Sequence, residues 1–266
     1  MTITLYELRG ADDRRFSPYC WRTRMALAHK GLEAVYEPCC FGEKGKFAFS
    51  GHDRMPVLTD GAKTIPESWD IACYLDDAYP DPPMRPATPY GRARMRLWTK
   101  RLDEGLHFNT GVLSGSIAFR YQHLARSAAE QKAYIEGIPD PARRERQRQQ
   151  LELGIEAPQF ATAVAAFERF LADMERTLAE AGPWLAGDSY SLAEIGYTPY
   201  IIRLDELSLW GWMDRRPHIV DWYERIKARP NFQPGYVDWR NDDYVALMTE
   251  KGAEAWPRIR QMIAAL

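Results

Sequence analysis

The proline-rich segment at residues 80–89 constrains the fold of this 266-residue chain more than any other feature. Five prolines stand within its ten positions, PDPPMRPATP. Because proline neither continues a helix nor donates to a sheet ladder, the segment predicts an extended linker. Strand and helix patterns alternate before it, and long helical patterns follow it. The sequence therefore predicts two regions of different structural class.

The first region begins with a strand, a helix and a second strand. Residues 2–7 alternate polar and apolar side chains, which is typical of a strand. Ser17 is a preferred N-cap and Pro18 suits the first helical position, so a helix is predicted from Ser17 to Lys30. Since this helix joins them, the strand predicted at 34–38 is expected to run parallel to the first strand.

The rest of the first region adds a hairpin and a helix. Short strands are predicted at 56–59 and 63–65, joined by the turn residues Asp60-Gly61. A second helix is predicted from Glu67 to Tyr79. The element order predicts an α/β region, a small mixed sheet flanked by helices, which matches the thioredoxin-like arrangement.

The region after the linker is predicted to be a bundle of helices. Apolar residues recur at helical spacing in residues 91–113 and 159–180. Residues 123–158 are polar and include the arginine-rich run ARRERQRQQ, which we interpret as a solvated helix face. Ser191 and Glu194 stand at the spacing of a capping box, which indicates the buried start of another helix.

Composition excludes several classes of function. The formal net charge of -2 provides no global positive field, so nucleic acid is not an expected partner. No apolar run reaches the roughly 18 residues of a membrane helix, and the N-terminus shows no targeting leader, so we expect a cytoplasmic protein. The four cysteines are irregularly spaced and the histidines scattered, so neither a disulfide framework nor a metal site is expected.

Three short motifs are the candidates for chemistry: Ser17-Pro18, Met55-Pro56 and Glu67-Ser68. Each has an ordinary structural interpretation, as a helix start, an entry into a strand and a second helix start. Their occurrence together, in this order within a β-α-β-β-α region, favours a functional interpretation.

With these motifs, the chain resembles the glutathione transferase family over most of its length. Arg54-Met55-Pro56-Val57-Leu58 resembles the family's cis-proline motif, and Pro66-Glu67-Ser68 resembles its glutathione-carboxylate site. The helix opened by Ser191 resembles the family's helical capping motif, and residues 222–230 resemble its late helix. The segments FSPYCWRTRMALAHKG and ESWDIACYLDDAYPD are most similar to the bacterial β-etherase branch, which cleaves aryl ethers with glutathione.

The resemblance implies a domain organisation and partners. A thioredoxin-like glutathione-binding domain is expected at residues 1–80, a linker at 81–89 and an all-helical domain at 90–266. Glutathione would be the cosubstrate, a small hydrophobic electrophile the second substrate, and the enzyme a homodimer.

Ser17 is the predicted catalytic residue. A free thiol with a pKa near 8.5 is ionised to only a few per cent at neutral pH, and only the thiolate is a useful nucleophile. The helix dipole and a hydrogen bond from the Ser17 hydroxyl would together lower that pKa by about 1–3 units.

The other motifs are expected to hold the tripeptide. Beside a cis Pro56, the Met55 backbone would pair with glutathione as a short added strand. Ser68 and nearby N–H groups would bind the γ-glutamyl carboxylate, and Glu67 would accept from its ammonium group. Arg54 is a candidate for a further carboxylate and equally for a solvated surface charge.

The electrophile is expected to bind between the two domains. The candidates are Tyr19, His107, Phe108 and the small-residue stretch Gly111–Ser116. Close packing between helices is an equally good interpretation of the residues after the linker.

Two other functions stay open from the sequence. Cys20 lies one turn into the first helix, and a reactive thiol there would make the protein a glutathione-dependent thiol-disulfide oxidoreductase. A packed Cys20 fits its inward position better. The third possibility is a protein that holds glutathione or hydrophobic ligands without turnover.

Overall fold

A computed structural model describes residues 2–40 and 42–266. Packing divides the chain into two compact units, each of which is described by itself. The first comprises Met1–Thr99, Leu178–Tyr200 and Val220–Asp242; the second comprises Lys100–Thr177, Ile201–Ile219 and Asp243–Leu266. The division into family domains at residues 1–80 and 90–266 stays a prediction of the sequence.

The first unit contains a four-stranded mixed sheet in the order β2-β1-β3-β4. Its strands are β1 (Ile3–Leu8), β2 (Ala34–Cys39), β3 (Val57–Asp60) and β4 (Lys63–Pro66). β2 is parallel to β1, whereas β3 is antiparallel to both β1 and β4. The predicted parallel pair and the predicted hairpin are both confirmed.

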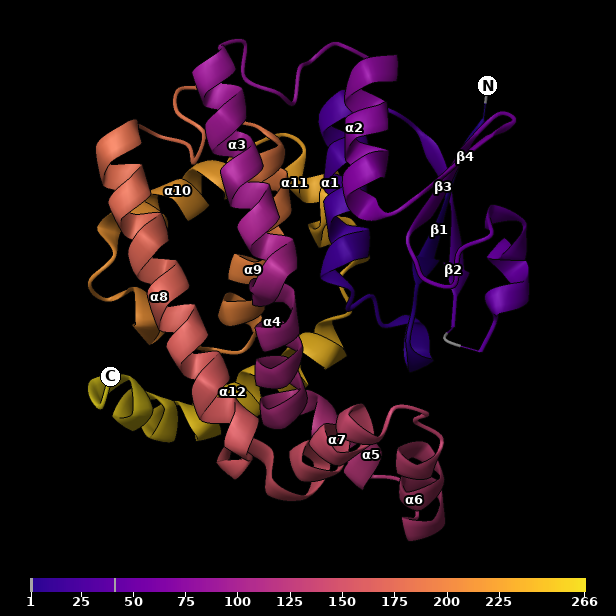
Figure 1. Ribbon diagram of the computed structural model, residues 1–266, viewed down its shortest axis with the longest axis vertical. Coiled ribbons are helices and arrows are strands. Elements are labelled where there is room, and N and C mark those ends of the chain that lie inside the picture. Colours follow the sequence, from indigo (N-terminus) through magenta and orange to yellow (C-terminus); the bar gives the residue numbers. More distant parts are fainter. Residues whose placement is uncertain (1, 41) are drawn as a thin grey trace. The chain divides into compact units, whose positions relative to one another are not determined.

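Two helices accompany the sheet, α1 (Pro18–Lys30) and α2 (Ser68–Ala78), and they lie side by side along it (Figure 1). The short helix α11 (Phe232–Gly235) packs against α1 closely, because a Cβ atom at Gly235 would lie 3.2 Å from Met25 Cα. Asn231 adds a hydrogen bond to the Tyr190 hydroxyl at 3.2 Å. The thioredoxin-like arrangement predicted for this region is confirmed.

The proline-rich linker is fixed by a buried lysine at the end of α1. Lys30 Nζ lies 2.7 Å from Asp76 Oδ1 and donates to the carbonyl of Pro82 at 2.6 Å. The same Asp76 oxygen accepts from the Met84 backbone N–H at 2.7 Å. These bonds tie the segment after α2 to both α1 and α2.

The regular secondary structure after β4 is helical, apart from one isolated bridge between Trp184 and Gly187. Its principal elements are α3 (Pro89–Arg101), α4 (His107–Ser114), α5 (Arg120–Leu124), α6 (Ala128–Glu136), α7 (Pro141–Leu153), α8 (Pro158–Ala181), α9 (Leu192–Glu206), α10 (Pro217–Lys227) and α12 (Asp242–Ala264). None of the described helices is long and apolar enough to cross a membrane. The predicted all-helical region is confirmed.

The helix predicted at 91–113 differs from the observed one in its internal geometry. Two π-helical turns, Leu102–Leu106 and Gly115–Phe119, flank α4 and join it to α3 and α5. A π turn inserts one extra residue into a helix and changes the direction of the side chains around it.

The capping box predicted before α9 is confirmed. Glu194 accepts from the Ser191 backbone N–H at 2.9 Å and from the Ser191 hydroxyl at 2.7 Å. Its other oxygen accepts from the Leu185 N–H at 2.6 Å. Burial raises the pKa of Glu194, and these hydrogen bonds oppose that effect. The box therefore has a structural role.

Candidate active site

Ser17 is the N-cap of α1, as predicted. Its backbone is extended (φ -83°, ψ 114°), and its Oγ accepts from the Cys20 N–H at 3.4 Å. The residue is only 7% exposed. A hydroxyl that accepts through its oxygen keeps a proton to donate, and the helix N-terminus adds partial positive charge. Ser17 is thus chemically suited to stabilise an anion.

Cys20 is packed beneath the first turn of α1. It is 2% exposed, and its sulfur accepts from the Leu8 N–H at 3.3 Å. Burial raises the pKa of the Cys20 thiol to about 12, although hydrogen bonds with Ser17 and Leu8 oppose the shift. A thiol that is buried and protonated at neutral pH is a poor nucleophile.

Ser68 begins α2 and is connected to α1 by a buried arginine. Arg22 Nη1 donates to Ser68 Oγ at 3.4 Å, and Arg22 Nη2 donates to the Tyr200 hydroxyl at 3.1 Å. The same guanidinium lies 4.8 Å from the centroid of the Tyr19 ring. The arginine links α1 to the first turn of α2, and sequence reasoning missed it.

Glu67 precedes Ser68 in an unusual backbone conformation. Its φ of 66° lies in the left-handed region, which side chains other than glycine rarely adopt. Its carboxylate oxygen Oε1 lies 3.0 Å from Nε2 of His52. Such a conformation costs of order 1 kcal/mol and is often found at functional sites.

Met55 and Pro56 enter β3 through a cis peptide bond, as the predicted cis-proline motif requires. Met55 packs against the cluster formed by Cys39, Phe47 and Val57. The Met55 backbone lies outside the described sheet pairing, which begins at Val57.

Arg54, the residue before this motif, is a solvated charge in the structure. Its side chain is 80% exposed, and its Nε lies 3.8 Å from the neighbouring Asp53 carboxylate.

The strand register brings the three motifs to one end of the sheet. Tyr6 on β1 pairs with Val57 on β3, and Val57 pairs with Pro66 on β4. The end of β1, the start of β3 and the end of β4 are therefore adjacent. Ser17, Met55-Pro56 and Glu67-Ser68 flank these three strand ends, so the fold gathers residues that are up to about fifty positions apart in the sequence.

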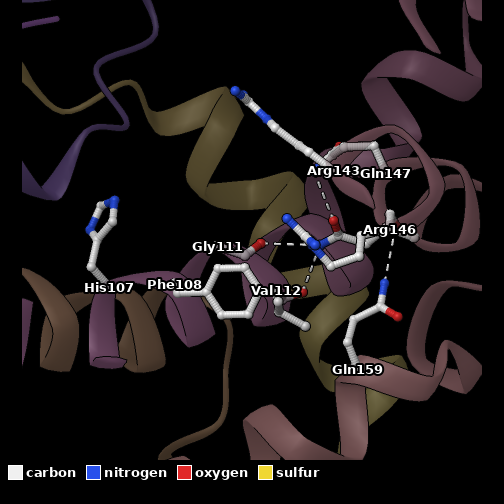
Figure 2. A pocket seen from close by; sticks show the side chains of 9 residues that line it. His107, Phe108, Gly111, Val112, Arg143, Arg146, Gln147 and Gln159 are labelled. Carbon is white, nitrogen blue, oxygen red and sulfur yellow. Dashed lines mark hydrogen bonds between the residues drawn. The ribbon is translucent and has the colours of Figure 1, made fainter. Parts of the chain in front are cut away.

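The second unit holds a pocket of about 290 Å³ between α4, α7 and the start of α8 (Figure 2). It contains the predicted His107 and Phe108, whereas the predicted Tyr19 belongs to the first unit. The lining residues are His107, Phe108, Gly111, Val112, Arg143, Arg146, Gln147, Gln150 and Gln159. The arginine-rich run is thus only in part a solvated face, because two of its arginines line this pocket.

The sequence left two interpretations of the small-residue stretch 111–116 open: room for a bulky ligand, and close packing between helices. The structure shows open space at one of its glycines and close packing at another. Gly111 lines the pocket, and a Cβ atom there would meet nothing within 4 Å. A Cβ atom at Gly115 would lie 2.2 Å from Nε2 of Gln150. Gly115 therefore allows close packing between helices, and Gly111 leaves open space.

Candidate metal ligands do not gather in the part of the chain that the structure describes. No group of three or more His, Cys, Asp or Glu side chains is placed there to hold an ion.

Two family models match this chain. The glutathione S-transferase N-terminal domain matches residues 13–83, and the glutathione S-transferase C-terminal domain matches residues 141–225. The chain belongs to the glutathione S-transferase family, a family of glutathione-dependent enzymes. The resemblance inferred from its motifs is confirmed.

Among its relatives is Protein LigF of Sphingobium sp. (strain NBRC 103272 / SYK-6), 26% identical over 95% of this chain and 100% of LigF. The crystal structure of β-etherase LigF from strain SYK-6 matches with a TM-score of 0.71 and 24% identity, covering 90% of this chain and 100% of that chain. The tetrachloro-p-hydroquinone reductive dehalogenase of Sphingobium chlorophenolicum is 25% identical over 70% of this chain and 77% of its own.

Proposed function

We propose that this glutathione transferase activates glutathione through the hydroxyl of Ser17. The observation that carries the proposal is the position of this hydroxyl. It caps the first turn of α1, at the sheet end flanked by Met55-Pro56 and Glu67-Ser68. An anion bound there meets a hydroxyl donor and the positive end of the helix dipole.

The energies are sufficient without a general base. The dipole contributes roughly 0.3–2 kcal/mol, and a hydrogen bond to a charged group about 1.5–3 kcal/mol. Together they lower the pKa of a bound thiol by about 1–3 units, from a starting value near 8.5. Thiolate is then abundant near neutral pH.

We assign the remaining motifs to glutathione itself. The Met55 backbone, outside the sheet pairing, is available to pair with the cysteinyl backbone of the tripeptide. Ser68 and the first N–H groups of α2 bind the γ-glutamyl carboxylate, and the exposed Glu67 carboxylate accepts from its ammonium group. We assign Arg54, whose side chain is exposed, to a further carboxylate of glutathione.

The reaction is a displacement or an addition at carbon. The thiolate sulfur forms a bond to an electrophilic carbon, and in a displacement the leaving group departs with its bonding electron pair. We propose aryl ether cleavage within this class, with an aryloxide as the leaving group. The name of the relative LigF, a β-etherase, supports this choice.

We assign the electrophile to the pocket of the second unit, where Phe108 and His107 offer aromatic surface. Tyr19 belongs to the first unit and is not among the residues that line this pocket, so it stays a prediction of the sequence. We also propose that the enzyme is a cytoplasmic homodimer whose four free cysteines stay reduced.

The test is glutathione-dependent turnover of a chlorodinitrobenzene, an aryl phenacyl ether and a small disulfide. Wild type, Ser17→Ala and Cys20→Ser are compared. We expect the first two substrates to be consumed and Ser17→Ala to be strongly impaired with both. If Cys20→Ser alone abolishes disulfide reduction, the redox function is correct instead; binding of glutathione without turnover of any substrate would support a binding protein.

A further inference from the structure

We propose that the pocket between α4 and α7 selects aromatic anions through Arg143 and Arg146. That such an anion is the electrophile rests on the proposed function; the binding selectivity itself does not. The ligand class is a one- or two-ring arene that carries an ionised acid group such as a carboxylate.

The arginines of α7 fall into two pairs with different surroundings. Arg144 donates to the backbone carbonyl of Ile138 at 2.9 Å. Arg148 forms ion pairs with Glu145 at 2.6 Å and with Glu152 at 2.7 Å. The protein's own acceptors therefore satisfy these two guanidinium groups.

Arg143 and Arg146 have no such carboxylate partner. Within residues 2–40 and 42–266, neither side chain forms an ion pair, and both line the pocket (Figure 2). The guanidinium of Arg146 lies 5.7 Å from the centroid of the Phe108 ring. Two positive charges thus face a space with no charge of the opposite sign among its lining residues.

The glutamine side chains of the pocket are already engaged. Gln150 Nε2 donates to the carbonyls of Gly111 and Val112 at 3.1 and 3.0 Å. Gln147 Nε2 donates to Gln150 Oε1 at 3.1 Å. Gln159 Nε2 in turn donates to the carbonyl of Arg146 at 3.0 Å. These amide groups therefore donate to acceptors within the protein. The guanidinium groups of Arg143 and Arg146 are the charged donors available to a ligand.

Phe108 supplies the apolar part of the site. Phe108 is 54% exposed and lines the pocket, so its ring is accessible to a ligand. A ligand ring packed on Phe108 would remove apolar surface from water. The volume of about 290 Å³ is at the small end of small-molecule sites, which limits the ligand to about one or two rings.

The combination defines the ligand by its chemistry. Guanidinium groups bind planar carboxylates through paired hydrogen bonds, and their strength exceeds that of neutral hydrogen bonds. A neutral arene of the same shape would gain the contact with Phe108 but not the interaction with Arg143 and Arg146. The pocket should therefore discriminate between an acid and its amide.

The test measures the affinity of the full chain for naphthoate and for naphthamide by calorimetry, without glutathione. We expect naphthoate to bind at least about tenfold more tightly, a difference of about 1.4 kcal/mol. The variant Arg143→Gln/Arg146→Gln should lose this preference. Arg148→Gln, which removes one charge from the same helix outside the pocket, should keep it.

Two results would overturn the proposal. One is equal affinity of the wild type for the two ligands, and the other is a naphthoate preference that survives in the double variant. Thermal unfolding of each variant checks that it is folded, and Arg146→Lys, which keeps the charge, should retain part of the preference.

A second measurement separates this proposal from the proposed function. The kcat/KM values are compared for a chlorodinitrobenzene and for its carboxylate-bearing analogue. The ratio of the two kcat/KM values, carboxylate-bearing over neutral substrate, should be about tenfold lower in the double variant than in the wild type. Selective binding of naphthoate without glutathione turnover would refute the proposed function and leave the pocket assignment standing. Turnover with an unchanged ratio would refute the pocket as the electrophile site.

Discussion

Ser17 and Cys20 stand one helical turn apart, and their surroundings give them different chemistry. The Ser17 hydroxyl is neutral, so it tolerates a nearly buried position while it accepts from the Cys20 N–H. The Cys20 thiol would have to ionise to act, and burial raises its pKa to about 12. Ser17 is therefore suited to donate to a bound thiolate, whereas Cys20 is a packing side chain.

We predict that Cys20→Ser keeps conjugation activity within about threefold, because the thiol takes no part in the chemistry. In the native wild type, alkylation by iodoacetamide near pH 8 should modify the partly exposed Cys40 and leave Cys20 unmodified. Mass spectrometry of tryptic peptides measures both. Rapid modification of Cys20 in the folded protein would show that its thiol is accessible and ionised.

The sequence predicted the three motifs of the candidate site but missed Arg22. Ser17, Pro56 and Ser68 have local signatures, a helix cap and an X-Pro step. Arg22 becomes part of the site only because folding places it 3.4 Å from Ser68, which is 46 residues away. His52 is likewise a surface histidine until folding brings it 3.0 Å from Glu67.

At the scale of elements, the helix that contains α4 depends on a side chain from α7. Gln150 donates to the carbonyls of Gly111 and Val112, just before the π turn at Gly115–Phe119. Hydrophobic periodicity predicts the helix but contains no information about this distant amide. The sequence therefore predicted a helix there and not its π turns.

We predict that Gly115→Ala destabilises the protein by about 1–2 kcal/mol, because the new methyl group would displace Gln150 from its two carbonyls. Gly111→Ala is the matched control, since nothing lies within 4 Å of its Cβ position. It should stabilise the helix by about 0.5–1 kcal/mol. Urea unfolding measures both, and equal effects would contradict the packing described for Gly115.

The end of α1 makes stability depend on pH. His29 lies with Nε2 3.3 Å from the Pro83 carbonyl and Nδ1 3.2 Å from Arg229 Nη2. Burial, together with the positive charges of Arg229 and Lys30, lowers the pKa of His29 from 6.5 to about 4, and the contact with the Pro83 carbonyl opposes this shift. The folded protein therefore holds this imidazole neutral.

Because the unfolded chain binds the proton first, we predict that His29 costs stability as the pH falls from 6.5 to about 4. Above pH 6.5 the imidazole is neutral in both the folded and the unfolded protein, so this loss of stability is absent. His29→Gln should show a weaker loss of urea midpoint across this window than the wild type does. Identical pH dependence of the two proteins would mean that His29 titrates normally in the folded state.

At the scale of the whole molecule, folding and ligand binding are coupled. The proposed glutathione site is assembled from motifs between residues 17 and 68, so the unfolded chain would have no such site. A ligand that binds only the folded state stabilises it by about 2.7 kcal/mol at one hundred times its dissociation constant. Glutathione should therefore raise the melting temperature.

We predict that this stabilisation grows between about pH 7 and pH 8.5, because glutathione releases a proton when it binds as the thiolate. S-methylglutathione, which has no thiol proton, should stabilise the protein without this pH dependence. Differential scanning fluorimetry across the pH range compares the two ligands. Parallel curves for both ligands would show that the bound thiol stays protonated.

The most direct measurement is the ultraviolet titration of the thiolate of enzyme-bound glutathione. In the wild type its pKa should lie about 1–3 units below the free value. In Ser17→Ala it should rise by about 1–2 units, since a hydrogen bond to the charged sulfur is lost, while Ser17→Thr should stay near the wild type. An unchanged thiolate pKa in Ser17→Ala would contradict the assignment of Ser17 as the residue that activates glutathione.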